Sequence, residues 1–377
     1  MHKIRVLIVV SLLFSISIFA QNNRSAVSLS GDDKAMCTVP DPCRTFGVAL
    51  SRTNSGGEVV VLSTAGYGPF TVSQSVSIIT PPAYHAAMAP TTGAAITVNA
   101  PGATVILRNL YLNSLGGFTG VSITSDSIVH IEGLVVNGFL LNGISVESSG
   151  TTAEVFVKDT EIRGNGEAGI YLGPSSGTAI ASIDHVRLEE NNYGVAADSG
   201  VSVSIRDAVA VKNTIYNFFF RNGGMLLPLR ATVEDSLAAD SLGDGFVALD
   251  GARVTVRDSA ALRNADGFRA ASGIMGVTGE MAIDHCLASE NGHGIFAGAY
   301  GVGSGLITVS NSTSARNAND GIRAGANGTV RAFSNTITKN SIGMDVVNGG
   351  VIRSGGHNFV DGNATETVGT ITSVPTM

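Results

Sequence analysis

Hydrophobic and polar residues alternate with a period of two in short runs along most of this chain. The runs are only a few residues long and rich in Val and Ile, as in Val155–Val157, Val201–Ile205, Val254–Val256 and Ile307–Val309. Alternation of this kind is typical of β-strands, and the runs are too short for helices. The pattern therefore predicts an all-β domain over residues 58–363.

The strands recur within a repeat whose polar positions keep a fixed spacing. A column of short polar or His residues is followed six residues later by a column of Asn or Ser, and three or four residues after that by a column that is almost always Gly. The first column is Asp159, His185, Asp207, Asp235, Asp258, His285, Asn311, Ser334 and His357; the second is Asn165, Asn191, Asn213, Ser241, Asn264, Asn291, Asn317, Asn340 and Asn363; the third is Gly143, Gly169, Gly194, Asn217, Gly245, Gly267, Gly294, Gly321 and Gly343.

Successive units are 22 to 28 residues apart. A unit of this size cannot bury its apolar side alone, so consecutive units must coil and stack into a solenoid. We expect the second column to form a hydrogen-bonded ladder and the His residues of the first column to occupy left-handed corners. We expect the glycines to supply tight or left-handed backbone geometry where the chain turns.

The N-terminus has the features of a targeting segment. Lys3 and Arg5 precede an apolar run over residues 6–19, which is followed by Ala20 and polar Gln21. This order predicts a secretory signal peptide over residues 1–20 and a protein that is secreted or lies on the exterior of the cell envelope.

Residues 21–57 are expected to form an N-terminal segment with a short capping helix, and residues 364–377 a C-terminal tail. Asp41 is the predicted N-cap, Pro42 the first helical position, and Gly56-Gly57 the end of the helix. In an oxidising compartment, Cys37 and Cys43 would form a disulfide. Cys286 is then left as a small buried side chain.

Composition excludes several classes of function. Charged residues make up only 14% of the chain, the net charge is −7, and no run of Lys or Arg is present to neutralise a phosphate backbone. Nucleic acid is therefore not an expected partner. No apolar run after the N-terminus is long enough to span a membrane.

The repeat, the strand pattern and the stacked polar columns resemble the pectin-lyase-like superfamily of right-handed parallel β-helices over residues 37–363. That superfamily includes pectate lyases, polygalacturonases, alginate epimerases, phage tailspikes and many secreted proteins of unknown activity. The resemblance implies the fold and leaves the function open.

Two sets of residues are candidates for a site. The strand after the Gly column places outward side chains in one stripe, which is Ser145, Tyr171, Ala196, Phe219, Val247, Arg269, Phe296, Arg323 and Asp345. Tyr171, Phe219, Arg269, Phe296 and Arg323 are the predicted substrate-binding residues, because rings stack on sugars and Arg pairs with carboxylates. The residues just before the Gly column form a turn column of Tyr193, Tyr216, Asp244, Asp266, His293 and Asp320.

All length differences between units fall at one corner, as insertions at residues 174–177, 222–228, 272–279 and 298–305. These insertions carry Met225, Leu226, Met275 and Tyr300, which are expected to be exposed. Variable loops on a rigid scaffold often carry binding sites, although they also occur as tolerated surface insertions.

The turn column also resembles polygalacturonase motifs. Asn264-Ala265-Asp266-Gly267-Phe268 is similar to the motif Asn-Thr-Asp-Gly-Phe of that family, and Gly292-His293-Gly294-Ile295 is similar to its motif Gly-His-Gly-Ile/Leu. The resemblance implies catalytic roles for Asp266 and His293, to which Asp244 and Asp320 on neighbouring units are added as candidates. The family's paired Asp-Asp motif and its Arg-Ile-Lys motif are absent, which counts against hydrolysis.

These patterns favour a secreted β-helix that binds an extended polysaccharide or serves as a surface or adhesion scaffold. The alternative is a glycoside hydrolase or polysaccharide lyase that uses the acidic turn column, and a second alternative is a purely structural envelope protein. No cofactor or metal is expected, although Asp244 with Asp266 offers the oxygen ligands that calcium prefers.

Overall fold

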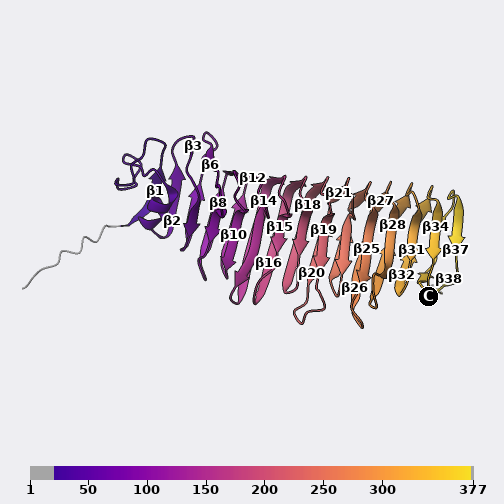
Figure 1. Ribbon diagram of the computed structural model, residues 1–377. Helices are drawn as coiled ribbons and strands as arrows, with labels where there is room; N and C mark the ends of the chain where they lie inside the picture. The colour runs from indigo at the N-terminus through magenta and orange to yellow at the C-terminus, as the bar shows by residue number, and fades with distance from the viewer. Residues whose placement is uncertain (1–20, 375–377) are drawn as a thin grey trace, which may run out of the picture.

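The computed structural model describes residues 21–374, and these residues form one elongated parallel solenoid (Figure 1). Strands of successive rungs pair in parallel and build one 25-stranded sheet and one 13-stranded sheet. The all-β solenoid that the alternation predicts is therefore confirmed. The predicted signal peptide over residues 1–20 lies outside the described residues.

The strands of the 25-stranded sheet are β1 (Asn22–Val27), β2 (Thr53–Val61), β3 (Ala65–Gly66), β5 (Val76–Ile79), β6 (Ala86–Met88), β8 (Thr104–Arg108), β9 (Leu110–Asn113), β11 (Ile128–Glu132), β12 (Val135–Asn137), β14 (Thr152–Arg163), β16 (Thr178–Glu189), β18 (Val201–Val211), β20 (Arg230–Glu234), β21 (Leu237–Ala239), β23 (Arg253–Arg257), β24 (Ala260–Leu262), β26 (Thr278–Asp284), β27 (Leu287–Ser289), β29 (Ser304–Ser310), β30 (Thr313–Ala315), β32 (Gly328–Phe333), β33 (Thr336–Thr338), β35 (Val351–Ser354), β36 (Phe359–Val360) and β38 (Ile371–Ser373).

The strands of the 13-stranded sheet are β4 (Phe70–Val72), β7 (Ala94–Val98), β10 (Thr119–Ser125), β13 (Ile144–Ser149), β15 (Ala168–Leu172), β17 (Tyr193–Ala197), β19 (Tyr216–Arg221), β22 (Phe246–Leu249), β25 (Asp266–Ser272), β28 (His293–Ala299), β31 (Asp320–Ala324), β34 (Ile342–Val346) and β37 (Thr365–Val368).

The residues of the first polar column lie at one corner of each rung. All nine residues of the first column have left-handed φ angles, from 47° at Asp258 to 56° at Ser334 and His357. The three His residues among them therefore serve as corner residues, as expected. The backbone bends there without leaving the sheet, so one rung contributes two strand segments before it crosses to the 13-stranded sheet.

The second column forms the predicted ladder of buried amides. Asn291 Oδ1 accepts from the backbone N–H of Asn264 at 2.9 Å and from its Nδ2 at 3.2 Å, and Asn317 repeats this pattern on Asn291. Ser241 breaks the column, but Asn217 bridges the break. Asn213 Nδ2 donates to Asn217 Oδ1 at 2.8 Å, and Asn217 Nδ2 donates to Asn264 Oδ1 at 3.1 Å. Ser241, the exception in the Asn column, and Asn217, the exception in the Gly column, thus compensate for each other.

The glycines of the third column do not have the left-handed geometry that the sequence suggested. The glycines with positive φ lie elsewhere, for example Gly177 and Gly251. The Gly column is instead required by close approach: a Cβ at Gly267 would lie 2.6 Å from Gly294 O and 2.9 Å from Asn291 Nδ2. Any side chain there would push neighbouring rungs apart and break the amide ladder.

The interior is filled by apolar side chains stacked rung on rung. The rings of Phe218, Phe246 and Phe268 stack with centroids 4.9 and 5.0 Å apart. Cys286 is a buried free cysteine, and burial raises the pKa of its thiol to about 11. Its Sγ lies 3.2 Å from the carbonyl of Asp284, so it acts as the structural residue that the sequence suggested.

The N-terminal cap differs in detail from its prediction. Helix α1 (Phe46–Ser51) has Thr45 as N-cap, not Asp41, so Pro42 precedes the helix. The reason is that Asp33 accepts from the backbone N–H groups of Arg44 and Thr45 and fixes the chain there, while the Asp41 carboxylate accepts from Met36 N. The helix ends at Ser51, and Gly56-Gly57, its predicted end, lies within β2.

Several other features of the cap are as predicted. The buried face of Phe46, Ala49 and Leu50 and the Cys37–Cys43 disulfide both match the expectation. Strand β1, which pairs with β2, was not predicted.

The solenoid also extends beyond residue 363, where the tail was expected to begin. Strand β37 pairs with β34, and β38 pairs with β35. The repeat columns end before these strands, and therefore the sequence pattern missed the last rung. Within residues 21–374, helices long and apolar enough to cross a membrane are absent.

Candidate functional site

The outer face of the 13-stranded sheet carries both predicted sets of site residues, and we call the part from Ser145 to Asp345 the site face. The strand registers place the stripe in one row, as predicted: Ser145, Tyr171, Ala196, Phe219, Val247, Arg269, Phe296, Arg323 and Asp345. Ser145, Ala196, Val247 and Asp345 are nevertheless buried. The expectation that the stripe is water-exposed is therefore wrong for part of it, because larger side chains on neighbouring strands of the same face, such as Tyr216 and Phe219 beside Val247 and Arg323 beside Asp345, cover the smaller ones.

One charged cluster is centred on Arg269. Its Nη1 lies 3.3 Å from Asp244 Oδ2 and 3.9 Å from Asp266 Oδ2, and Asp244 Oδ1 also accepts from the backbone N–H of Asp266 at 3.1 Å. The side chains of Asp244 and Asp266 are only 4% and 10% exposed. Burial raises the pKa of both carboxyls, and the neighbouring Asp244 charge helps to raise that of Asp266 to about 6.

A second cluster continues along the same face. His293, which pairs with Asp266 in the sheet register, has its Nδ1 2.7 Å from Asp320 Oδ2. Arg323 Nη1 lies 3.3 Å from the same oxygen, and Arg323 Nε lies 3.7 Å from Asp345 Oδ2. Burial, followed by the charge of Asp320, raises the pKa of Asp345.

Phe296 joins the two clusters. The guanidinium carbons of Arg269 and Arg323 lie 5.5 and 5.9 Å from its ring centroid, within the range of cation–π attraction. The four predicted catalytic residues and three of the predicted binding residues thus form one continuous network. The arginines, however, are already paired with carboxylates of the protein.

The remaining two predicted binding residues lie farther toward the N-terminus. Phe219 stacks on Tyr216 with centroids 5.1 Å apart and contacts Tyr193 at 5.3 Å. Tyr171 donates to Asp198 Oδ2 at 2.8 Å, and burial followed by this hydrogen bond raises the pKa of Tyr171. Tyr171, Asp198 and Arg221 line a hollow of about 360 Å³ in this part of the face.

The insertion loops at the edge of the site face are tied together by Asp250, which sequence analysis did not single out. Its fully buried carboxylate lies 2.9 Å from Arg221 Nε and accepts from Gly273 N at 2.9 Å and from the hydroxyl of Tyr300. Each partner belongs to a different insertion or its base. Burial raises the pKa of Asp250, but these hydrogen bonds outweigh burial and lower it overall.

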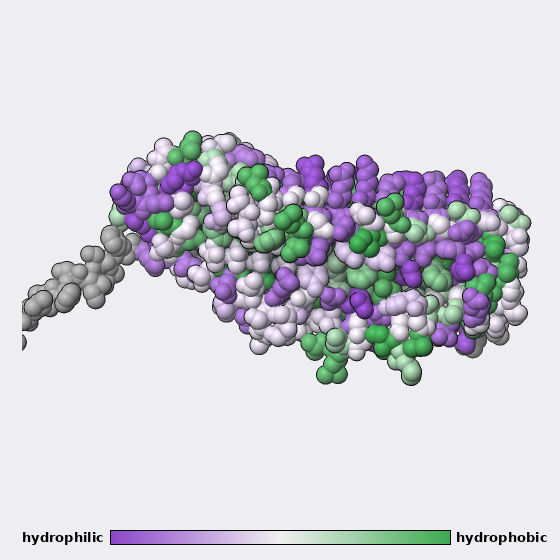
Figure 2. All heavy atoms as spheres, in the orientation of Figure 1, coloured by the Kyte–Doolittle hydropathy of each residue, from purple (hydrophilic) through white to green (hydrophobic). Residues whose placement is uncertain are grey.

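The loop tips are exposed as predicted. Leu226 is 98% exposed and Met275 is 79% exposed. Figure 2 shows the apolar tips as protrusions from the lower edge of the molecule, where Figure 1 shows the long loops before β20 and β26.

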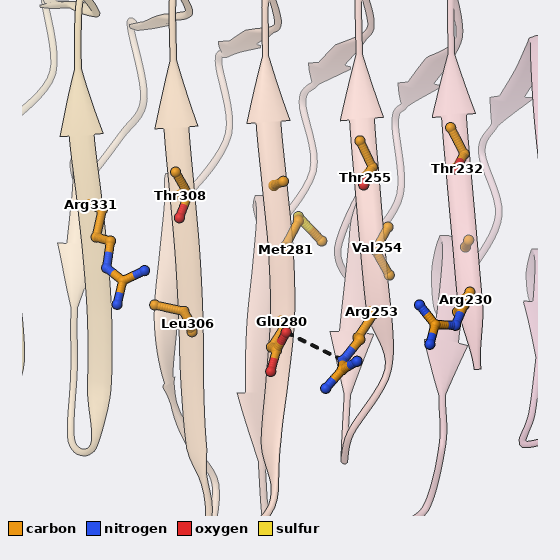
Figure 3. Close-up of a pocket in the computed structure, with 12 residues that line it drawn as sticks. Arg230, Thr232, Arg253, Val254, Thr255, Glu280, Met281, Leu306, Thr308 and Arg331 are labelled. Carbon is orange, nitrogen blue, oxygen red and sulfur yellow. Dashed lines mark ion pairs between the residues drawn. The ribbon is translucent and has the colours of Figure 1, made fainter. Parts of the chain in front are cut away.

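A separate hollow of about 450 Å³ lies on the outer face of the 25-stranded sheet. Figure 3 shows Arg253 paired with Glu280 across neighbouring strands, with Arg230 and Arg331 on strands to either side. The Arg253–Glu280 pair is 3.4 Å long, and both side chains are more than 40% exposed. We place the candidate site on the site face instead, because its titratable groups are buried and their pKa values are perturbed.

No group of three or more His, Cys, Asp or Glu side chains within residues 21–374 is arranged to hold a metal ion. Asp244 and Asp266 have an arginine between them, and its positive charge occupies the place that a cation would take.

The stacked parallel strands and the amide ladder define a parallel β-helix, and comparison with known protein families gives the same class. The chain belongs to the right-handed β-helix family, because the model described as a right handed beta helix region matches residues 168–365, more than half of its length. A search of curated proteins found no match.

Three similar solved structures illustrate the fold. The catalytic domain of a GH87 α-1,3-glucanase in complex with nigerose has a TM-score of 0.57 and 13% identity, covering 87% of this chain and 65% of that chain. XylC in complex with xylose has a TM-score of 0.49 and 9% identity, covering 84% and 76%. An alginate lyase from Paenibacillus sp. strain FPU-7 has a TM-score of 0.46 and 13% identity, covering 90% and 100%. At these identities the likeness shows the fold alone.

Proposed function

We propose that the site face binds an extended polysaccharide chain. The observation that carries this proposal is the row of rings on one side of the 13-stranded sheet, where Tyr193, Tyr216 and Phe219 form a partly exposed cluster and Phe296 lies farther along. Rungs are about 4.8 Å apart, so the rings follow a linear ligand and offer stacking surfaces for successive sugars. The fold shared with a glucanase domain that was solved with nigerose bound supports a glycan ligand.

We also propose that the protein is secreted. The charged, apolar and small-residue order of residues 1–20 supports this proposal, as does the disulfide between Cys37 and Cys43, because disulfides persist in oxidising compartments. Mass spectrometry of exported protein tests it: the mature chain should begin near Gln21 and should have no free thiol at either cysteine.

A second candidate function is hydrolysis of the bound glycan, and the Asp244–Asp266 pair favours it. A carboxyl whose pKa is raised to about 6 holds a proton in mildly acidic solution and can donate it to a glycosidic oxygen. Asp244, whose charge Arg269 and the N–H of Asp266 stabilise, is placed to act as the partner carboxylate.

The spacing of rungs sets the stereochemical expectation. Carboxyls on adjacent rungs are about 5 Å apart, which is typical of retaining glycosidases. We therefore expect the Asp244–Asp266 pair to retain the anomeric configuration. Asp266 with Asp320, two rungs away, would be about 10 Å apart and would instead suit inversion. Proton NMR of the first product distinguishes the two pairs.

The experiment is a screen of neutral, acidic and amino polysaccharides that measures binding, new reducing ends and unsaturated products. An Asp266→Asn variant should bind as the wild type does, and any hydrolysis should fall by at least about 100-fold. Glu280→Gln on the opposite face is the matched control and should change neither. Absence of binding to every polysaccharide would overturn the first proposal, and binding without cleavage would overturn only the second.

A further inference from the structure

The site face carries most of the excess negative charge of the protein. Eight carboxylates lie on it or at its loop edge: Glu147, Glu167, Asp198, Asp244, Asp250, Asp266, Asp320 and Asp345. Three guanidinium groups share this surface: Arg221, Arg269 and Arg323. Eight negative and three positive charges leave −5 when every carboxylate is ionised, out of a net charge of −9 for residues 21–377, because Lys3 and Arg5 lie in the predicted signal peptide.

The arginines of this face are not free to bind an anionic ligand. Arg269 lies between Asp244 and Asp266, Arg323 lies between Asp320 and Asp345, and Arg221 is paired with the fully buried Asp250. An incoming uronate or sulfate would have to break these pairs and would leave the protein carboxylates buried without a counter-charge, which is strongly unfavourable. It would also approach a surface on which carboxyl groups outnumber guanidinium groups by eight to three.

An unpartnered acceptor on this face indicates what kind of group would be favourable there. The Nε atoms of Arg269 and Arg323 and Nδ1 of His293 also have no hydrogen-bond partner, but each of these side chains already lies within ion-pair distance of a carboxylate. Asp345 is 4% exposed, points outward in the stripe, and its Oδ1 is the one unpartnered acceptor among these residues. Buried carboxylate oxygens without a donor are rare, and the missing interaction is one that a donor or a cation can supply. Burial is the first cause of the raised pKa values of Asp244, Asp266 and Asp345, and the charge of a neighbouring carboxylate adds to it at Asp266 and Asp345.

We propose that the glycan bound by the site face is a polymer of amino sugars with free ammonium groups, and that polyuronates and sulfated glycans are excluded. This inference rests on the proposed function, since it names the substrate class of the same surface. The aromatic rings provide stacking that any pyranose can use, and the excess carboxylates select among pyranoses by charge. The sequence suggested that Arg269 and Arg323 pair with the carboxylates of a polysaccharide. The surface on which they lie instead selects cationic sugars.

The test compares three hexasaccharides that differ in charge: a glucosamine hexamer, an N-acetylglucosamine hexamer and a galacturonic acid hexamer. Calorimetry at about pH 6 gives the affinities at low and high salt. The glucosamine hexamer should bind about tenfold more tightly than its neutral counterpart at low salt, and added salt should remove most of this difference. The galacturonic acid hexamer should bind more weakly than both.

The outcomes separate this inference from the proposal beneath it. If none of the three hexamers binds, the proposed glycan function fails for these sugars and the inference fails with it. If the galacturonic acid hexamer binds most tightly, or if the two hexosamine hexamers bind equally at low salt, the inference is overturned while glycan binding stands.

A pair of variants locates the effect on this face. The double substitution Glu147→Gln and Glu167→Gln leaves the ion-pair network intact, because both carboxylates lie outside it. It should weaken binding of the glucosamine hexamer about threefold and reduce its salt dependence, without changing binding of the neutral hexamer. Glu280→Gln on the 25-stranded sheet removes a charge far from the site face and should change neither. Equal effects of the two variants would mean that only the net charge of the protein matters, which would overturn selection by this face.

Discussion

The solenoid carries charge on two outer faces and arranges it in opposite ways. On the 25-stranded sheet, one outward position alternates in sign over eight successive rungs: Arg108, Glu132, Lys158, Asp184, Arg206, Glu234, Arg257 and Asp284. We call this row the charge ladder. On the site face, carboxylates of the same sign occupy adjacent rungs, as at Asp244 and Asp266.

The two arrangements have opposite effects on the stability of the fold. In the charge ladder every acid lies beside a base near water, as in the Arg206–Asp184 pair at 3.1 Å, and such pairs contribute about 0.2–1 kcal/mol each. On the site face the carboxylates are buried beside one another, which raises the pKa of Asp266 and destabilises the fold at neutral pH. Destabilisation by buried charges of the same sign is typical of functional sites. The alternating charges of the charge ladder do not destabilise the fold, and they align the rungs.

The largest effect is expected at Asp250, whose carboxylate is buried but fully partnered. Asp250→Asn leaves Arg221 without its counter-charge and weakens the bonds to Gly273 and Tyr300, so we expect a loss of about 3 kcal/mol in unfolding free energy. Chemical denaturation measures it. Because the folded pKa of Asp250 is lowered, its contribution is present above the unfolded pKa and is lost as the pH falls through the folded value.

Asp240 is the matched control for this substitution. Its carboxylate pairs with Arg263 at 2.6 Å, but its side chain is 38% exposed. Asp240→Asn should therefore cost no more than about 0.5 kcal/mol. If the two variants lose equal stability, Asp250 does not clamp the loops.

The next prediction is a gain in unfolding free energy. Asp266→Asn removes a buried carboxyl whose pKa rises from 3.8 to about 6, so the variant should be more stable than the wild type by about 3 kcal/mol at pH 8. The folded state binds more protons than the unfolded state between these two pKa values, and stability therefore falls as the pH rises through this window. The gain should vanish below about pH 4. A destabilised variant at pH 8 would show that the carboxylate is well paired and would contradict the comparison.

A third effect tests whether the arginines of the site face serve the protein itself. Outward side chains usually cost about 0.5 kcal/mol when truncated. Arg269→Ala should cost about 1–2 kcal/mol instead, because it leaves Asp244 and Asp266 buried without their cation. Thermal unfolding should also show that the loss grows with pH, as the two carboxyls ionise. A cost near that of an ordinary surface change would mean that the arginine is free to pair with a ligand.

The sequence was sufficient for the solenoid because its signals are local and repeated. The left-handed first column and the amide ladder each follow from one residue type at one spacing. The helix start was not predictable, because Asp33 sets it through tertiary hydrogen bonds.

The burial and the ion pairing of the site residues could not be predicted from the sequence. The turn column and the stripe were both found, and both lie where the pattern placed them. The sequence pattern did not predict their burial, because it depends on how the side chains of neighbouring rungs pack against one another, as Arg269 does against Asp244 and Asp266. Whether Arg269 is free or paired depends on that burial. The sequence pattern alone therefore did not show whether this arginine could bind the carboxylates of a polysaccharide.

The smallest effect concerns the charge ladder, where each change acts in water. Arg206→Glu places three acids in a row with Asp184 and Glu234, and it should cost about 1 kcal/mol at low salt. Adding Glu234→Arg to this variant restores one opposite-charge contact but sets Arg beside Arg257, so only part of the loss should return. Salt should erase most of both effects, since these side chains are largely exposed. If the single reversal costs as much in high salt as in low salt, the ladder acts through packing and not through charge, and its contrast with the site face disappears.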